Sequence, residues 1–320
     1  MKGQYVTAVL STTGTIFFII AIGYFAVARK VLSRDGLEVL GRYVLNLALP
    51  ALIFSAVSGR GFNEISNFAY LAGYLVASLS VLLLGYFLSR ILWKTNPLSS
   101  TFDATGMACA NSGFVGYPLL MMVLPTIAPT ALALNMIVEN LVVIPLVLIL
   151  AERASAPTLR GRSMVKLVLH RVSTNPIVLA MVAGIVVSVT QLPIPNFATK
   201  GIDLIAQSSA AVCLFVIGGT LVGISIRSVG KRIFGVVAGK LILLPLAVWM
   251  SFGFLELIGA GSVSPNLRNA AIIMAATPAM TLYPVLAQKY GQEEQAATAM
   301  LVMTLLSFFT ISGLLYLLDI

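Results

Sequence analysis

The sequence predicts an all-α membrane protein of ten transmembrane helices, arranged as two inverted five-helix repeats with broken helices at positions four and nine. Three observations predict this fold. The 320-residue chain is 59% hydrophobic and only 10% charged, against about 25% charge in soluble proteins. It divides into ten long apolar segments. The two Tyr-Pro dipeptides of the chain lie at equivalent places in its two halves.

Each apolar segment is long enough to cross a bilayer, because a hydrocarbon core of about 30 Å needs about 20 helical residues. The first segment is too long for the apolar region of a signal peptide, which spans about 7–15 residues. The segments, separated by charged or Pro/Gly-rich gaps, are 6–28, 37–58, 67–92, 102–124, 130–151, 168–190, 199–225, 233–257, 268–289 and 294–318.

The net charge of +9 indicates membrane topology rather than nucleic-acid binding, because the basic residues lie in short gaps between apolar segments. Most Lys and Arg residues follow the odd-numbered segments. The positive-inside rule then predicts a multi-pass protein of the cytoplasmic membrane, the inner membrane of the cell, with both termini on the non-cytoplasmic side.

The most basic gap divides the chain into two halves of five segments. It contains Ser155, Ala156, Pro157 and Gly161, a composition typical of a linker. We therefore expect a first repeat at 1–151, a cytoplasmic linker at 152–167 and a second repeat at 168–320. Because five is odd, the second half starts on the opposite side of the membrane, and the repeat is inverted. Inverted repeats are typical of secondary transporters.

The repeat is strongest at the Tyr-Pro steps, Tyr117-Pro118 and Tyr283-Pro284, which are 166 residues apart (283 minus 117). Proline lacks an N–H and clashes with the carbonyl one turn back. The freed backbone groups cannot face lipid, so they must face protein, water or a ligand. A simple proline kink is the alternative, but two equivalent steps favour a pair of broken helices.

Broken helices predict a binding site at their ends. Half-helix N-termini offer N–H groups and a positive dipole end to an anion, and the opposite ends offer carbonyls to a cation. Small or polar residues would let a substrate approach the backbone there. The expected substrate site comprises Asn111, Ser112, Gly113, Tyr117, Pro118, Thr277, Pro278, Thr281, Tyr283 and Pro284, with Asn46 and Gln207 lining its other face.

Glu139 lies in the middle of the fifth segment and is followed by Asn140. Ionisable groups inside a membrane span are functional candidates by default. These two residues are our candidates for coupling transport to H⁺ or Na⁺, and Asn111 with Glu139 is the candidate Na⁺ site. A purely structural, hydrogen-bonded glutamate is the alternative. Lys240 follows a basic segment edge, which favours snorkelling to the interface over attraction of an anion.

Other residue types exclude several functions. Cys109, Cys213 and the single histidine, His170, lie in or beside apolar segments and suggest neither a disulfide nor a transition-metal site. No phosphate-binding Gly-x-x-x-x-Gly-Lys-Ser/Thr motif occurs, which disfavours ATP-driven transport by this chain. No catalytic triad or metal cluster supports an enzyme, and no resident cofactor is expected.

The sequence resembles the auxin efflux carrier family over essentially its whole length. Three stretches carry the resemblance: Asn46 to Phe54 matches Asn-x-x-x-Pro-x-x-x-Phe, Asn111 to Leu120 is similar to Asn…Gly-x-Pro-Leu-Leu, and Pro284 is followed by Ala287-Gln288-Lys289-Tyr290-Gly291. The short gap between the halves is similar to that of bacterial members.

The resemblance implies a fold shared with bile-acid sodium symporters. Helices one, two, six and seven would form a scaffold, and helices three to five and eight to ten a transport domain that moves as an elevator. It also implies a homodimer and small organic anions, such as malate or malonate, as substrates.

The leading hypothesis is a secondary-active carrier of a small organic anion, a symporter for H⁺ or Na⁺. A uniporter or ion-independent efflux carrier for an auxin-like acid is one alternative. A channel or membrane sensor of the same fold is another.

Overall fold

The computed structural model of this chain describes residues 2–59, 67–155, 173–223 and 229–319, with side chains from Gly14 onward. The described residues form helices and connecting turns, and within them the one β-type pairing is an isolated antiparallel bridge between Ala110 and Ala279. The all-α class expected from the sequence is confirmed.

The first half contains α1 (Lys2–Ala28), then α2 (Arg34–Tyr43), η1 (Val44–Ala48) and α3 (Leu49–Ser58) as one continuous rod, α5 (Phe68–Leu92), α6 (Pro97–Ala108), η2 (Ser112–Gly116), α7 (Tyr117–Val123), and a second rod of α8 (Ala128–Val138), η3 (Glu139–Val143) and α9 (Ile144–Ser155).

The second half contains α11 (Pro176–Thr190), α12 (Asn196–Thr220), a rod of α13 (Lys231–Ala238), η4 (Gly239–Leu243) and α14 (Leu244–Leu257), then α15 (Pro265–Ala275), α16 (Tyr283–Gln288) and α17 (Glu293–Leu317).

Six of these helices are long and apolar enough to cross a membrane, among the residues described. They are Arg34–Ser58, Phe68–Leu92, Ala128–Ser155, Asn196–Thr220, Lys231–Leu257 and Glu293–Leu317. Shorter apolar helices run over Gly14–Ala28, Ser112–Val123 and Pro176–Thr190. Each overlaps a segment expected from the sequence. The expected sixth segment begins at 168, and its residues up to 172 lie outside the described part of the chain, as do His170 and most of the linker.

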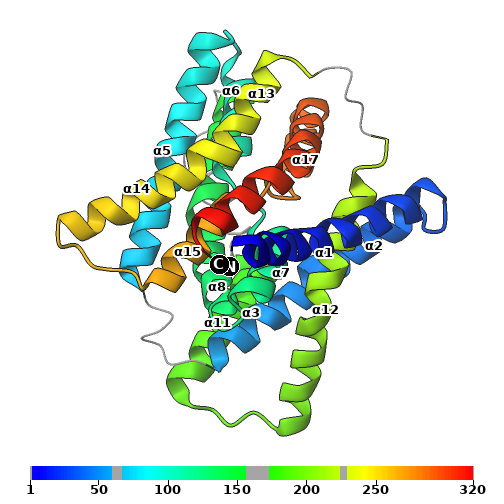
Figure 1. Cartoon of the computed structure of the whole chain (residues 1–320), viewed down its shortest axis with the longest axis vertical. Helices are drawn as coiled ribbons and strands as arrows, with labels where there is room; N and C mark the ends of the chain where they lie inside the picture. The colour runs from blue at the N-terminus through cyan, green and yellow to red at the C-terminus, as the bar shows by residue number, and fades with distance from the viewer. Residues whose placement is uncertain (1, 60–66, 156–172, 224–228, 320) are drawn as a thin grey trace.

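The helices gather into two groups (Figure 1). In one group α1 packs on α12, and α3 packs on α11 and α12. In the other α5 packs on α6 and α14, and α17 packs on α13 and α16. The rod of α8 and α9 lies between them and contacts α3 on one side and α5 on the other. A contiguous apolar core therefore runs through both groups.

Each of the four η elements is a π-helical turn, and each ends two residues before a proline. The prolines are Pro50, Pro118, Pro145 and Pro245. Because proline has no N–H, the carbonyl four residues earlier loses its helical partner, and a wider turn lets the helix continue. The π turns hold Asn46, Ser112, Glu139 and Lys240. Three of these side chains, Ser112, Glu139 and Lys240, are buried, whereas Asn46 is exposed.

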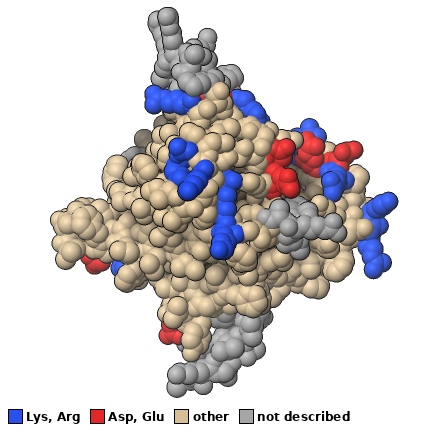
Figure 2. Space-filling model, turned by 90° about the horizontal axis from the view of Figure 1, so that it is seen from above, with Lys and Arg blue, Asp and Glu red and all other residues tan. Residues whose placement is uncertain are grey.

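Lys and Arg side chains spread over the face seen from the end that carries α6 and α13 in Figure 1, beside a group of acidic residues (Figure 2). Exposed basic residues at this end include Arg90, Lys94 and Lys231. Arg90 lies near the end of the third expected segment, Lys94 follows it and Lys231 follows the seventh.

Helices α1 and α12 pack at backbone contact through glycine. A methyl group added at Gly218 would lie 1.8 Å from the Ile20 carbonyl oxygen, and one at Gly23 would lie 2.0 Å from the Phe215 carbonyl oxygen. Small residues let membrane helices approach closely, where van der Waals contact drives their association.

We therefore predict that Gly218→Ala lowers the stability of the folded protein by about 1–3 kcal/mol, because the backbones must separate. The matched control is Gly201→Ala in the same helix, where an added methyl group meets nothing within 4 Å. Thermal unfolding in detergent measures both variants. Equal midpoints for the two would contradict the close packing.

Candidate functional site

The fourth and ninth segments are both interrupted in the middle. In the fourth, α6 ends at Ala108 and η2 begins at Ser112, with Cys109 in an extended conformation. In the ninth, α15 ends at Ala275 and α16 begins at Tyr283.

The sequence placed the first interruption at Tyr117-Pro118, and this position is wrong. Tyr117 and Pro118 lie inside a continuous helical stretch, Ser112–Val123. Pro118 has no N–H to donate, and the wider π turn of η2 lets the helix continue past it. In the ninth segment the interruption ends directly at Tyr283-Pro284, where Pro284 occupies the first turn of α16, a position that proline tolerates.

The two interruptions pair with each other. The backbone N–H of Asn111 donates to the Pro278 carbonyl at 3.0 Å and to Thr277 Oγ1 at 3.1 Å. The Asn111 side-chain amide donates to Thr281 Oγ1 at 3.0 Å, and its oxygen accepts from the Phe114 N–H at 3.3 Å. Asn111 thus joins the two interrupted segments and caps the N-terminus of η2. Asn111 and Thr277, the equivalent residues of the sequence repeat, contact each other directly.

Glu139 is the acidic residue of this cluster and is only 3% exposed. Its Oε1 accepts hydrogen bonds from the Ala110 N–H at 3.3 Å, Ser112 Oγ at 3.1 Å and Tyr74 Oη at 3.4 Å. A carboxylate is stabilised by backbone and hydroxyl donors at the N-terminal end of a helix. The structure therefore places Glu139 at the start of η2, beside Asn111.

A further polar layer, which the sequence reasoning missed, supports Ser112. Asn135 donates to Ser112 Oγ at 3.2 Å, and Tyr70 donates to Asn135 Oδ1 at 2.6 Å. The rings of Tyr70 and Tyr74 stack at 6.1 Å between centroids. The tyrosines of α5 thereby hold the Glu139 and Asn135 side chains of the α8–η3 rod. Tyr70 and Tyr74 are four residues apart, one turn of a helix. In the sequence, this spacing could have indicated that both hydroxyls lie on one face of α5.

A small cavity of about 40 Å³ adjoins this cluster. Its polar lining comprises Asn111, Ser112, Glu139, Asn140 and Thr281, and Gly113 exposes backbone there; Leu45, Leu49, Met136, Ile144 and Ile177 are among its apolar walls. A larger cavity of about 330 Å³ shares Leu45, Asn140, Ile144, Ile177 and Leu282 with it, and is also lined by Asn46 and Asn175. Asn175 donates to Asn140 Oδ1 at 3.2 Å. The two spaces form one path from the cluster toward the start of α11.

Several expected site residues lie away from this path. Tyr117 and Gln207 line a separate cavity with Asp203, which accepts a hydrogen bond from Ser55 at 2.6 Å. Thr277 is fully buried and serves the pairing of the segments. Pro278 takes part in that pairing through its carbonyl.

Two more expected residues, Tyr283 and Pro284, also lie elsewhere. Tyr283 is buried against Gly106, where an added methyl group would lie 2.9 Å from the tyrosine Oη. Pro284 lines a different surface hollow, together with Gln288. Pro118 is buried behind η2. These residues shape the segments rather than the cavity.

Lys240 does not snorkel, so that expectation is wrong. Its side chain is fully buried, and its ammonium donates a hydrogen bond to the carbonyl of Ala275, the last residue of α15. Helix ends carry unpaired carbonyls and partial negative charge, so the nearest partner for the ammonium is internal.

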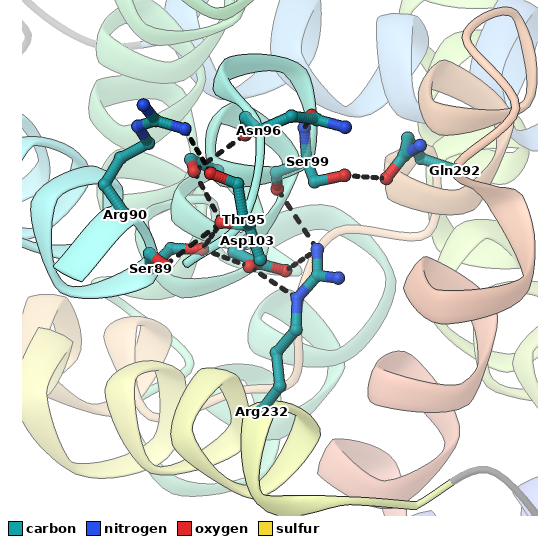
Figure 3. A network of polar contacts seen from close by, with 9 residues as sticks. Ser89, Arg90, Thr95, Asn96, Ser99, Asp103, Arg232 and Gln292 are labelled. Carbon is teal, nitrogen blue, oxygen red and sulfur yellow. Dashed lines mark hydrogen bonds and ion pairs between the residues drawn. The ribbon is translucent and has the colours of Figure 1, made fainter. Parts of the chain in front are cut away.

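A second buried ion pair, also missed from the sequence, joins α13 to α6 (Figure 3). Arg232 donates to the Asp103 carboxylate through Nε at 2.8 Å and Nη2 at 2.9 Å, and Ser89 donates to the same carboxylate. Ser99 adds its carbonyl to Arg232 and donates its hydroxyl to Gln292 at 2.8 Å. In the sequence, Asp103 lies within an apolar segment, and this could have indicated a buried carboxylate that needs a basic partner. This network joins residues of α5, α6 and α13 to Gln292, which directly precedes α17 (Figure 3).

No group of three or more His, Cys, Asp or Glu side chains converges to hold a metal ion within the described residues. Asn111 and Glu139, the expected Na⁺ ligands, both border the smaller cavity. Their oxygens are engaged with Phe114, Ala110, Ser112 and Tyr74.

Comparison with known proteins gives matches over most of the chain. A model of the family described as membrane transport protein matches residues 8–315. A protein of Rhizobium meliloti (strain 1021) named "Putative malonate transporter" is 25% identical, over 94% of this chain and 93% of its own. The transporter YfdV of Escherichia coli (strain K12), named as uncharacterized, is 25% identical over 92% of both chains. The lysosomal cholesterol signaling protein of Mus musculus is 26% identical over 90% of this chain but 35% of its own length.

The Asp103–Arg232 pair generates a stability prediction. Asp103→Asn leaves the Arg232 guanidinium, which is 22% exposed, without its counter-charge and should cost about 1.5–3 kcal/mol, the range for hydrogen bonds to a charged group. Glu256→Gln is the matched control, because Glu256 is mostly exposed and lies 3.7 Å from Arg268; exposed pairs contribute about 0–1 kcal/mol. Thermal unfolding of the purified variants measures the difference. A midpoint for Asp103→Asn no lower than that of the control would refute the assigned role.

Proposed function

Because the chain belongs to the membrane transport protein family, which confirms its resemblance to the auxin efflux carriers, we propose that it is a secondary-active transporter of a small organic anion. The names of the Rhizobium and Escherichia relatives are those of transporters rather than enzymes. A malonate-like carboxylate is the substrate class that the Rhizobium relative suggests. The observation that carries the proposal is the cluster of Asn111, Ser112, Glu139 and Thr281, which borders a cavity beside two interrupted, mutually paired membrane segments.

In the proposed architecture, ten membrane segments form two inverted repeats, 1–151 and 168–320, whose interrupted segments cross at Ala110 and Ala279. The helices of segments one, two, six and seven form the scaffold, and the rest form the transport domain. The packing of α1 on α12 and of α3 on α11 supports the scaffold. The packing of α5 on α6 and α14 supports the transport domain. The cavity lies between Leu45 and Leu49 of the proposed scaffold and Asn111 of the transport domain, as an elevator carrier requires.

The polar side chains that border the smaller cavity favour a polar ligand. Asn111 and Thr281 present an amide and a hydroxyl, and Gly113 lets a ligand approach the backbone at the start of η2. Such a helix N-terminus attracts a carboxylate. The path toward the start of α11 leads to the side with the basic linker. We therefore interpret the structure as open toward the cytoplasm, with both termini on the other side of the inner membrane.

Glu139 gives the proposed transporter its coupling residue. A substrate carboxylate bound at the N-terminal end of η2 would lie close to an ionised Glu139. The two negative charges would then repel each other. Protonation of Glu139, or a cation beside it, removes this repulsion. Asn140 lies next to Glu139 and borders both cavities, so it is placed to respond to the ligand. Symport with H⁺ or Na⁺ follows from this arrangement.

A sensor is the second candidate function, favoured by one observation: the mouse relative is named a signaling protein. An ion-independent uniporter for an auxin-like acid and a channel are further alternatives within the same fold. Counterflow of radiolabelled malonate in proteoliposomes separates them, because a carrier exchanges substrate with saturation, a channel does not saturate in this way, and a sensor binds without moving substrate. We also propose a homodimer, which the mass of the complex in detergent measures.

Asn111→Ala should reduce malonate uptake about 10- to 100-fold, since lost buried hydrogen bonds cost about 1–3 kcal/mol and each 1.4 kcal/mol is tenfold. Uptake into proteoliposomes measures the loss, and size-exclusion chromatography checks folding. Asn266→Ala, at an exposed position at the start of α15, is the matched control. Normal uptake by Asn111→Ala would remove the Asn111 side chain, with its bonds to Thr281 and Phe114, from the mechanism.

Glu139→Gln should abolish the dependence of uptake on the coupling ion, because glutamine keeps the shape of the side chain but has neither a titratable proton nor a negative charge to attract a cation. Uptake is measured with imposed pH and Na⁺ gradients in separate experiments. Glu152→Gln is the control, since Glu152 bonds Lys289 and Tyr290 at the end of α9. A Glu139→Gln protein that still responds to the same gradient as the wild type would exclude Glu139 as the coupling residue.

A further inference from the structure

Lys240 is the one fully buried lysine among the described residues, at 0% exposure. It lies nine residues after Lys231, the first residue of α13, which is about 13 Å along a helix. This depth approaches the middle of a core about 30 Å thick. A buried ammonium is costly unless it is paired and hydrogen-bonded, so its surroundings explain why it is there.

The ammonium lies at the C-terminal end of α15, the first half of the interrupted ninth segment. It donates to the carbonyl of Ala275, the last residue of α15. The neighbouring Gly239 brings η4 against the end of α6, because a methyl group there would lie 2.6 Å from Met107 Sδ. Both α6 and α15 end at this point, and each helix end carries a partial negative charge of about half a unit. Lys240 therefore occupies the position where two half-helices favour a cation.

Three carbonyls near that of Ala275 already accept hydrogen bonds. The Met274 carbonyl accepts from Thr277 Oγ1 at 2.7 Å, and the Pro278 carbonyl accepts from the Asn111 N–H at 3.0 Å. The Ile272 carbonyl accepts from the Ala276 N–H. A free alkali cation needs several oxygen ligands to replace its hydration shell. Lys240 takes the Ala275 oxygen that such an ion would use.

The buried charges of Glu139 and Lys240 also disfavour a bound Na⁺ ion. Glu139 of η3 and Lys240 of η4 are both buried, at 3% and 0% exposure. One buried carboxylate and one buried ammonium leave no net charge for a further cation to neutralise. A Na⁺ ion placed beside Glu139 would also be repelled by the ammonium. Lys240 does not line the cavity beside Asn111, so its place is behind the ligand rather than in contact with it.

We propose that Lys240 is a tethered cation that takes the place of a coupling Na⁺ ion at the end of α15. The transporter therefore works without Na⁺, and Glu139 responds to protons alone. Lys240 is a residue that determines coupling-ion specificity, and this inference rests on the proposed transport function. It predicts that removing the ammonium creates a Na⁺ site from the Ala275 carbonyl and the Glu139 carboxylate.

The test compares purified wild type, Lys240→Ala and Lys240→Met in NaCl and in choline chloride at equal ionic strength. A ligand that binds the folded state raises its melting midpoint. We expect equal midpoints for the wild type and a rise of roughly 2–4 °C in Na⁺ for Lys240→Ala. Lys289→Ala is the matched control, because Lys289 is exposed and pairs with Glu152 at the end of α9. Its midpoint should not respond to Na⁺.

Two results would overturn the proposal. One is a wild type that Na⁺ stabilises specifically, or whose malonate uptake falls when Na⁺ is replaced by choline. The other is a folded Lys240 variant that Na⁺ does not stabilise. If Lys240→Ala and Lys240→Met do not fold, the double variant Glu139→Gln/Lys240→Met, which removes both charges, should fold and lack any response to Na⁺; a response there would also overturn the proposal. The melting assay needs no transport, so failure of malonate uptake would count against the proposed function alone.

Discussion

The structure depends on one constraint: two membrane segments are interrupted, and the freed backbone groups have no water to bond. Each such group would cost several kcal/mol in hydrocarbon. The interruptions meet these needs mutually. Ala110 pairs with Ala279, and Asn111 bonds Pro278, Thr277 and Thr281. Neither interruption is satisfied alone, so the two halves of the chain must come together for either to be stable. The polar cavity lies where they meet.

The two buried charges follow from the same constraint. Glu139 accepts hydrogen bonds at the start of η2, which is the positive end of a half-helix, and Lys240 donates to Ala275, at the negative end of another. Each charge is stabilised by backbone dipoles and each balances the other. In the proposed transporter the carboxylate responds to the coupling ion and the ammonium fixes which ion that is. The Asp103–Arg232 pair holds α13, which leads to Lys240, against α6 (Figure 3).

The sequence predicts the fold class and places Asn111 and Thr277 at one site, because composition and a repeated dipeptide report burial and internal symmetry. It places the first interruption wrongly, at Tyr117-Pro118, since a proline can be absorbed by a π turn and no local pattern tells a kink from a break. It misses the partner of Lys240 and the Asp103–Arg232 pair, because these contacts join residues 35 and 129 positions apart. We inferred snorkelling of Lys240 from its neighbours in the sequence alone. In the structure its ammonium instead donates to the carbonyl of Ala275, 35 residues away.

The pairing of the interrupted segments is tested most directly by a disulfide between Ala110→Cys and Ala279→Cys, with Cys109 and Cys213 replaced by alanine. Residues facing each other in an antiparallel bridge have Cα atoms about 4.5–5.5 Å apart, within the range of a disulfide. Mild oxidation in native membranes should form the cross-link nearly completely, seen as loss of thiol labelling after denaturation. Folded protein that keeps both thiols free under the same oxidation would contradict the pairing and the site built upon it.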